Sequence, residues 1–338
     1  MYHIKIKKMM KKRNFYRLMF VVLLALLPLS GMSRTIRGDV NRDGCIDIND
    51  ITALIHYVLT GDASSVDVLA CQVNYTDNTV NVEDVTELIK MVLNGAYCPP
   101  IELTIPEGSV TYTVNGVEFQ MVPVDGGTFM MGGTSTQNTP IHQVTLSSYW
   151  IGLTEVTVGL WKAVMGSFDM EMYEDDQPAS NMSWSQCHEF IARLNELTGM
   201  NFCLPTEAQW EFAARGGNLS QGYTFAGSNY LNEVAWFNGN FPWSYRQIPC
   251  VGTKSPNELG LYDMSGSLRE FCQDAYYAPY PSDPQVDPLQ DWPANGKVVG
   301  RGGSFFTDSI YCAVNSRWSL ERSTVQYDCG LRLALGPD

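Results

Sequence analysis

Oxygen-bearing side chains recur between residues 39 and 50 in a pattern suited to a hard divalent cation. Counted from the first of them, they occupy positions 1, 3, 5, 9 and 12 of the stretch: Asp39, Asn41, Asp43, Asp47 and Asp50. Gly44 stands where such a loop turns sharply, and the carbonyl of Cys45 falls at position 7. Because alternate groups of a tight loop converge on one ion, the spacing predicts a calcium loop of the EF-hand type, with aspartate replacing the usual final glutamate.

A second copy of the pattern follows. GDVNRDGCIDINDITALIHYVLTG and CQVNYTDNTVNVEDVTELIKMVLNG both run from a polar loop into an amphipathic helix that ends in Leu-x-Gly. The second loop has thirteen residues from Gln72 to Asp84, and its first position is neutral, so it is the weaker site. Asp77, Asn81 and Asp84 remain as candidate ligands of a second calcium ion.

Taken together, residues 38–98 resemble a type I dockerin, that is, two calcium loop–helix units packed back to back. The resemblance implies a small all-α, EF-hand-like domain that docks onto a cohesin-like partner protein through its helix faces. The alternative is a calcium-stapled spacer, because a segment of this size buries little core and needs its metal to fold.

The first 33 residues have the pattern of an export signal. Seven basic residues precede the apolar run LMFVVLLALLPLS, which is too short to span a bilayer, and small residues follow it. We expect cleavage near residues 31–33 and a secreted protein, located in the periplasm, at the cell surface or outside the cell. A retained anchor is the alternative; after cleavage no stable membrane span is expected.

Net charge limits the classes of binding partner, and cysteine content bears on disulfide bonds. Removing the seven basic residues of the signal from 22 leaves 15 against 36 acidic residues, a net charge of −21. This charge argues against nucleic acid and anionic membranes and suits divalent cations, or serves solubility alone. The nine cysteines permit disulfides in an oxidising compartment, but their odd number leaves at least one thiol without an intrachain partner, and the pairing stays open.

A proline-containing linker over 99–112 leads to a large domain over 113–336. Two helices are predicted there, in SWSQCHEFIARLNELTG and TEAQWEFAARGG, ended by Gly199 and Gly216. In the second, Thr206 and Gln209 form a capping box. The rest predicts short strands and long loops, an α+β domain rich in irregular backbone.

Six ordered blocks of this domain resemble the formylglycine-generating, sulfatase-modifying-factor family: FQMVPVDGGTFMMGG, HQVTLSSYWIGLTEVT, CLPTEAQWEFAARGG, VGTKSPNELGLYDMSGSLREF, VGRGGSFF and GLRLAL. The resemblance implies a variant of the C-type lectin fold with bound calcium. It also implies the family's best-known activity, which is copper-dependent oxidation of a sulfatase cysteine to formylglycine.

The residues that match the family's oxidase site are incomplete. Cys312 matches the second active-site cysteine and Ser304 the serine near the oxygen site, but Thr307 replaces the first cysteine. Arg269 replaces the active-site tryptophan, and Cys203 an arginine. Two thiolates are needed to bind soft Cu(I), and a hydroxyl is a poor substitute. We therefore expect no oxidase activity; Cys312 and Ser304 with copper are the catalytic candidates if it persists.

Calcium binding in the large domain is a separate expectation. The resemblance places an ion between the side chains of Asp263 and Glu270 and the carbonyls of Gly266 and Leu268. The alternative is that Asp263 caps a turn and Glu270 pairs with a buried arginine, either Arg301 or Arg332.

These patterns predict a secreted calcium-binding protein whose large domain binds a protein or carbohydrate ligand without catalysis. Residues 305–329 are rich in Tyr, Asn, Ser, Asp, Arg and Trp, which recognise ligands with little loss of rotamer freedom. Some relatives on this fold are hypervariable receptors, and this composition is compatible with that. The alternatives are a formylglycine-generating oxidase and a dockerin-mediated assembly component.

Overall fold

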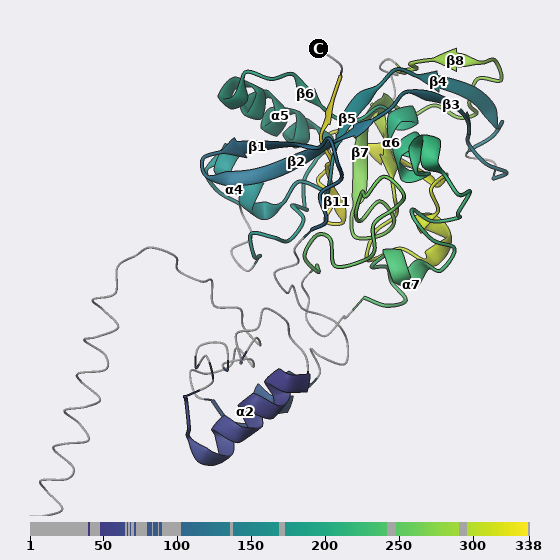
Figure 1. The fold of residues 1–338 in the computed structure, drawn as a ribbon. Coiled ribbons are helices and arrows are strands. Elements are labelled where there is room, and N and C mark those ends of the chain that lie inside the picture. The colour runs from purple at the N-terminus through teal and green to yellow at the C-terminus, as the bar shows by residue number, and fades with distance from the viewer. Residues whose placement is uncertain are drawn as a thin grey trace, which may run out of the picture.

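The computed structural model describes residues 40, 48–64, 66, 68, 71, 80–82, 84–86, 88–89, 103–135, 138–168, 173–241, 248–290 and 296–336. In its N-terminal part, helix α2 (Ile48–Thr60) follows the first predicted calcium loop (Figure 1). The helix ends at Gly61, whose φ is 69° and whose N–H donates to the Tyr57 carbonyl at 2.8 Å. A small core supports it: Val40, Leu54, Val66, Cys71 and Leu88.

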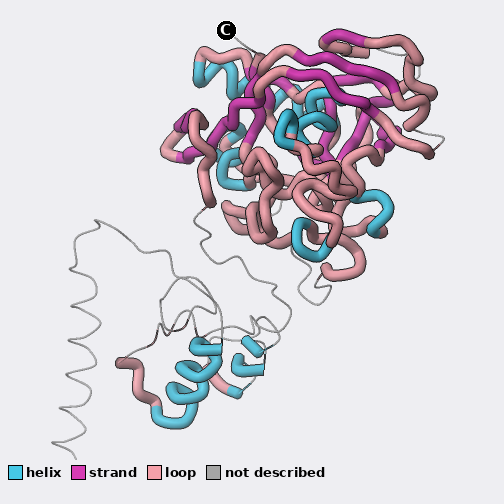
Figure 2. The backbone as a smooth tube through the Cα atoms, turned by 45° about the vertical axis from the view of Figure 1, so that its right-hand side comes forward, coloured by secondary structure: helices cyan, strands magenta, loops and turns pink. Residues whose placement is uncertain are grey.

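Within its described residues, the large domain contains three sheets and much irregular backbone. The first has the order β1-β2-β5-β12-β6: Val110–Val114, Val117–Val124, Tyr149–Gly152, Ala334–Leu335 and Phe202–Cys203. The second has the order β10-β9-β7-β11: Arg317–Glu321, Lys297–Arg301, Arg269–Ala275 and Cys329–Gly330. The third has the order β3-β4-β8: Gly127–Met131, His142–Leu146 and Gln285–Val286. Figure 2 shows the strands gathered toward one side of the domain and loops filling the other.

Both predicted helices of the large domain are confirmed. They are α5 (Trp184–Thr198) and α6 (Glu207–Ala214). The described residues also form helices α4 (Val158–Met165) and α7 (Leu231–Val234) and short 3-10 helices η1 (Gly217–Leu219) and η2 (Ser309–Cys312). Capping boxes start α5, through Ser183 and Gln186, and α6, through Thr206 and Gln209. Gly199 ends α5 in the left-handed conformation.

Two boundaries differ from the sequence prediction. Helix α6 ends at Ala214, two residues before Gly216, which instead precedes η1. Strand β1 begins at Val110, inside the stretch predicted as linker, because its alternating residues pair with β2 in register. Ordered packing starts earlier still: the N–H of Thr104 donates to the Tyr262 hydroxyl at 3.1 Å.

The five-stranded sheet divides the hydrophobic core. Side chains alternate across a strand, so neighbouring residues of β2 enter different cores. Met121 packs in the cluster that contains α5, and Val122 packs in the cluster that contains α6. The α+β architecture is thus two apolar layers on either side of one sheet, with the loops attached to their edges.

Buried ion pairs connect α6 to the second sheet and fix the end of β9. Arg301 is fully buried and forms ion pairs with Glu207 at 3.1 Å and with Glu211 at 2.5 Å. Arg317 on β10 also binds Glu207, at 2.6 Å. Because breaking such a pair leaves a buried charge uncompensated, these ion pairs stabilise the position from which the chain leaves Arg301.

Within the described residues, no helix has both the length and the apolar character needed to cross a membrane.

Candidate functional site

The segment that matches the oxidase site begins where β9 ends. Gly302 and Gly303 adopt positive φ angles of 89° and 72°, which turn the chain away from the sheet. A Cβ at Gly303 would lie 2.8 Å from the Cys312 sulfur, so only glycine lets this turn pass the thiol. The segment ends in η2, which brings Cys312 back beside Thr307.

The structure places a hydroxyl where a second thiol would be needed. Thr307 Oγ1 lies 3.8 Å from Cys312 Sγ, and the Asp308 carbonyl is at 4.0 Å. The hydroxyl also serves the turn, since it accepts from the Ser304 N–H at 2.9 Å and donates to the Ser304 carbonyl at 3.1 Å. Cys312 is fully buried, and burial raises the pKa of its thiol to about 11. At neutral pH the sulfur is therefore a protonated thiol rather than a thiolate.

Ser304 is directed away from that sulfur. Its hydroxyl donates to Asp328 at 2.7 Å, and Asp328 also accepts from the guanidinium of Arg269. Arg269 in turn lies over the Trp318 ring at 4.8 Å. The arginine that replaces the family tryptophan thus pairs with a buried aspartate, and this ion pair orients Ser304.

The other thiols lie in separate parts of the described structure. Cys203 is on β6, where its sulfur contacts the Ala334 carbonyl at 3.6 Å. Cys272 is in the core cluster around α6, and Cys329 is in the cluster around α5. Cys312 belongs instead to a small cluster with α7. A second sulfur supplied from a remote part of the large domain is therefore not seen among the described cysteines.

The residues expected to hold calcium in the large domain are occupied by other bonds. Glu270 accepts from Arg332 at 2.7 Å and from the Trp210 indole at 2.6 Å, so both its oxygens are engaged. Asp263 accepts from the Gly252 N–H at 2.6 Å. Among the described residues no group of three or more His, Cys, Asp or Glu is placed to hold a metal. These residues do not fit a calcium ion in this arrangement; Glu270 instead has the buried arginine partner that was the alternative.

Glu155 is a further member of this cluster, and no pattern in the sequence predicted it. Its carboxylate accepts from the Leu268 N–H at 2.9 Å and from the Ser267 hydroxyl at 3.1 Å, on the backbone segment expected to bind calcium. Burial, with Asp263 and Glu270 nearby, raises the pKa of Glu155 well above its ordinary value. No local signal marks Glu155, because more than a hundred residues separate it from Leu268.

Most of the N-terminal calcium ligands lie outside the described residues: Asp39, Asn41, Asp43, Cys45, Asp47 and Asp77. The final carboxylates of the two loops are described. Asp50, in the first turn of α2, and Asp84 are both fully buried, and Asp84 accepts from the Asn81 N–H at 2.9 Å. The last carboxylate of each predicted loop is therefore buried in both copies, as expected of a repeat.

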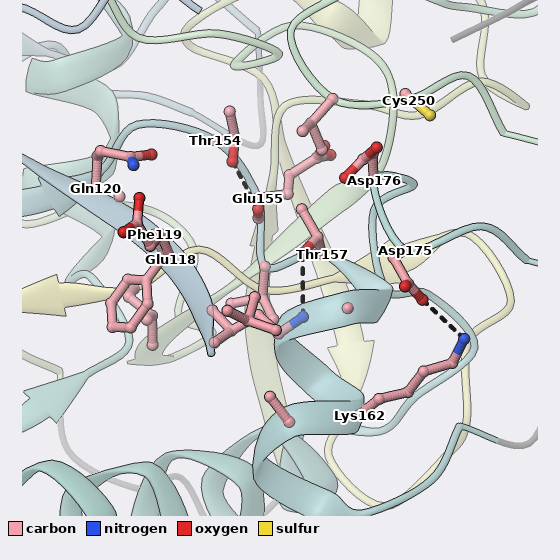
Figure 3. Close-up of a pocket in the computed structure, with 18 of the residues that line it drawn as sticks. Glu118, Phe119, Gln120, Thr154, Glu155, Thr157, Lys162, Asp175, Asp176 and Cys250 are labelled. Atoms are coloured by element: carbon pink, nitrogen blue, oxygen red, sulfur yellow. Dashed lines mark hydrogen bonds and ion pairs between the residues drawn. The ribbon is translucent and has the colours of Figure 1, made fainter. Parts of the chain in front are cut away.

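A polar cavity of about 720 Å³ lies on the side of the domain formed by β2 and the start of α4 (Figure 3). Four acidic side chains line it, Glu118, Glu155, Asp175 and Asp176, against one ammonium, that of Lys162. Lys162 is held by Asp175 at 3.0 Å. The Coulomb energy of this lining disfavours an anionic occupant. Leu103, Cys250 and Val251 complete one wall.

Several apolar side chains are exposed in the interval that contains Cys312. Five side chains of the interval 305–329 are at least 39% exposed: Phe306, Ile310, Tyr311, Val325 and Tyr327. Phe306 and Tyr327 meet edge to face with their centroids 5.4 Å apart, and Tyr311 packs on Trp318 at 4.8 Å. Exposed aromatic side chains held in place by one another are suited to ligand contact.

Comparison with known proteins agrees with this fold. Residues 111–336 match the model of the sulfatase-modifying factor enzyme 1-like domain, and the chain belongs to that family. Residues 37–93 match the dockerin type I domain, a class of calcium binders whose partners are cohesin-type proteins.

Individual relatives differ in what they are named for. The chain is 28% identical to the chaperone protein LppX of Paenibacillus barcinonensis over 266 residues, which cover 64% of this chain and 89% of that protein. It is 26% identical to the formylglycine-generating enzyme of Thermomonospora curvata over 202 residues, covering 55% of this chain and 63% of that enzyme. The solved structure of Treponema denticola variable protein 1 is 29% identical, with a TM-score of 0.63, and matches over 69% of this chain and 100% of that one.

Proposed function

We propose that this chain is an exported, non-catalytic binding protein in which the large domain holds a ligand and the dockerin module, with bound calcium, attaches it to a cohesin-type partner. The observation that carries the proposal is the pair formed by Thr307 and Cys312. A buried, protonated thiol with a hydroxyl 3.8 Å away provides one soft ligand at most, and that ligand must first lose its proton.

Copper binding and aldehyde formation test the loss of catalysis. Purified full chain is titrated with Cu(I) and incubated in air with a peptide that contains Cys-x-Pro-x-Arg. We expect no retained copper and no aldehyde. Thr307→Cys is the matched variant, because it places a second sulfur beside Cys312 and should raise Cu(I) affinity. Stoichiometric copper in the natural chain together with aldehyde in the peptide would contradict the proposal.

The ligand surface is proposed to be the apolar side chains of residues 305–329. A chaperone among the relatives favours a protein ligand over a carbohydrate one. The full chain is applied to peptide and glycan arrays, and Phe306→Ala and Tyr327→Ala are compared with Val286→Ala. Val286 is 73% exposed on β8, so its removal controls for a general loss of apolar surface. Equal loss of binding in all three variants would exclude this surface.

Attachment through the dockerin module is tested separately. The full chain is captured on an immobilised cohesin with and without EGTA, and Asp43→Ala removes one predicted ligand of the stronger loop. Capture should require calcium and should weaken in the variant, because the loop must be metal-bound to hold its helices. Capture that is unaffected by chelation would leave the spacer alternative standing.

A further inference from the structure

Two buried hydrogen-bond donors beside the exposed apolar side chains of residues 305–329 have no acceptor among the described residues. They are the Nε1–H of Trp318 and the Nε–H of Arg269. Buried donors in folded proteins are almost always bonded, because a donor removed from water without a replacement acceptor is costly. Two such donors on side chains that touch each other therefore point to an acceptor that comes from outside the chain.

The second sheet brings the two donors together. Trp318 on β10 pairs with Gly300 on β9, which in turn pairs with Phe271 on β7. Paired residues of neighbouring strands, and residues two apart in one strand, project from the same face of a sheet. Arg269 is two residues before Phe271, so its side chain shares the face of Trp318. The guanidinium carbon of Arg269 lies 4.8 Å from the Trp318 ring centroid, and Gly300 places no side chain between them.

The charge of Arg269 is already balanced, which selects the kind of acceptor. One Nη of its guanidinium donates to Asp328, whose side chain is 1% exposed. A second carboxylate at the Nε–H would lie close to Asp328 and be repelled by it. A neutral acceptor avoids this repulsion, and the backbone carbonyl is the neutral acceptor that every residue of a peptide carries. The Trp318 indole can only donate, so it also fits a carbonyl oxygen.

Exposed aromatic side chains adjoin the donors. Tyr311 packs on Trp318 with ring centroids 4.8 Å apart and is 39% exposed. Tyr327 directly precedes Asp328 in the chain and meets Phe306 edge to face at 5.4 Å. A peptide that bonds to the two donors can therefore lay its own apolar side chains on these rings. Because the donor nitrogens are buried, Tyr311 must turn away from Trp318 before a peptide oxygen reaches them.

We infer that Trp318 and Arg269 form a subsite that binds a backbone carbonyl of an apolar peptide, with Tyr311 as its cover. The inference deepens the proposed function and rests on it, because it names the ligand class of the surface proposed there. A bound carbonyl supplies the missing acceptor, so it stabilises the conformation in which Tyr311 is turned away. Arg269 stands where the family's oxidase pattern has tryptophan, so the subsite uses a residue that this pattern lacks.

A titration with a minimal peptide fragment tests the subsite. The full chain, isotope-labelled at its tryptophan indole nitrogens, is titrated with N-acetylphenylalaninamide, an uncharged molecule with a ring and amide carbonyls, and followed by NMR. Trp318→Phe assigns the Trp318 signal among the eight tryptophans. That signal should move downfield and saturate, because its N–H gains an acceptor. The Trp236 signal should stay in place, since its N–H already donates to Thr253 at 2.6 Å. N-acetylglycinamide, which lacks the ring, should bind at least about tenfold more weakly.

Variants separate the subsite from a general defect in folding. Trp318→Phe keeps a ring but loses the donor, and it should weaken binding of N-acetylphenylalaninamide about fivefold, whereas the matched control Trp236→Phe should leave it unchanged. Tyr311→Ala should speed solvent exchange of the Trp318 N–H at least about tenfold if Tyr311 is the cover.

Three results overturn the inference. One is a Trp318 signal that does not respond to the probe, as when only an internal water bonds to this donor. Another is an equal response to N-acetylglycinamide, and the last is tighter binding of N-acetylphenylalanine, whose carboxylate would show an anion site. Array binding that is lost in Phe306→Ala and Tyr327→Ala but kept in Trp318→Phe would retain the proposed surface and remove the subsite alone.

Discussion

The reactivity of Cys312 measures directly whether an oxidase-competent sulfur is present. Burial raises its pKa from the ordinary 9.0 to about 11, which lowers the thiolate fraction near pH 8 by about 100-fold, or roughly 2.7 kcal/mol. The side chain is also fully buried, so a reagent reaches it only when the segment opens. We therefore expect native Cys312 to react with iodoacetamide at least about 100-fold more slowly than the same residue in denatured protein.

The assay is favoured by the sequence around Cys312. Trypsin cleaves after Arg301 and Arg317, and the peptide between them contains a single cysteine, so its alkylated fraction reports on this thiol alone. Native and denatured protein are sampled over time at pH 8. Thr307→Val should slow the reaction further, because the Thr307 hydroxyl is one of the groups that lower the pKa of this thiol. A native rate within about threefold of the denatured rate would show an accessible thiolate and refute the reasoning.

Three further predictions concern the large domain. Arg332→Met should lower the free energy of unfolding by about 3–5 kcal/mol, because it leaves Glu270 buried without its partner. The melting temperature should fall by roughly 10 °C. A loss of stability under about 1 kcal/mol would contradict the importance of this ion pair. EGTA should shift the thermal unfolding of the calcium module but leave that of the large domain unchanged, and a shift in the large domain would restore a calcium site there. Burial raises the pKa of Asp274 to about 7, so the folded state binds this proton more tightly than the unfolded chain does. The free energy of unfolding, measured with urea, should therefore fall between pH 4 and pH 7 by up to about 4 kcal/mol from this group. Asp274→Asn should reduce this dependence of stability on pH.

Local features of the sequence predicted local structure well. The capping box of α6, the glycine that ends α5 and the glycine after α2 each depend on residues a few positions apart, and each is found where expected. The end of α6 was misplaced at Gly216, because the capping residue is Arg215, whose N–H bonds to two earlier carbonyls. The contacts of residues 104–112 depend on the hairpin with β2 and on Tyr262, which is far along the chain, so local pattern alone could not place the end of the linker.

The candidate sites also differ in whether local sequence or distant contacts determine them. Loss of the oxidase pair follows from one residue type, Thr307, and the structure confirms its place beside Cys312. At Glu270 the sequence offered two alternatives, calcium or a buried arginine such as Arg332, and it gave no sign of Trp210; Arg332 and Trp210 bond to both carboxylate oxygens from distant segments. A motif specifies which ligands are available, but long-range packing decides which of them remain free to bind an ion.

This distinction also bears on how the residues that replace the family's oxidase pattern are held. Arg269 and Thr307 replace two residues of the oxidase pattern, yet each has its own partner, Asp328 and the Ser304 turn. Because both replacements are bonded in place, restoring one cysteine would supply a sulfur without restoring the surroundings that activate oxygen. Thr307→Cys should therefore gain copper affinity while aldehyde formation stays absent, and aldehyde from this single change would show that the remaining scaffold is still catalytic.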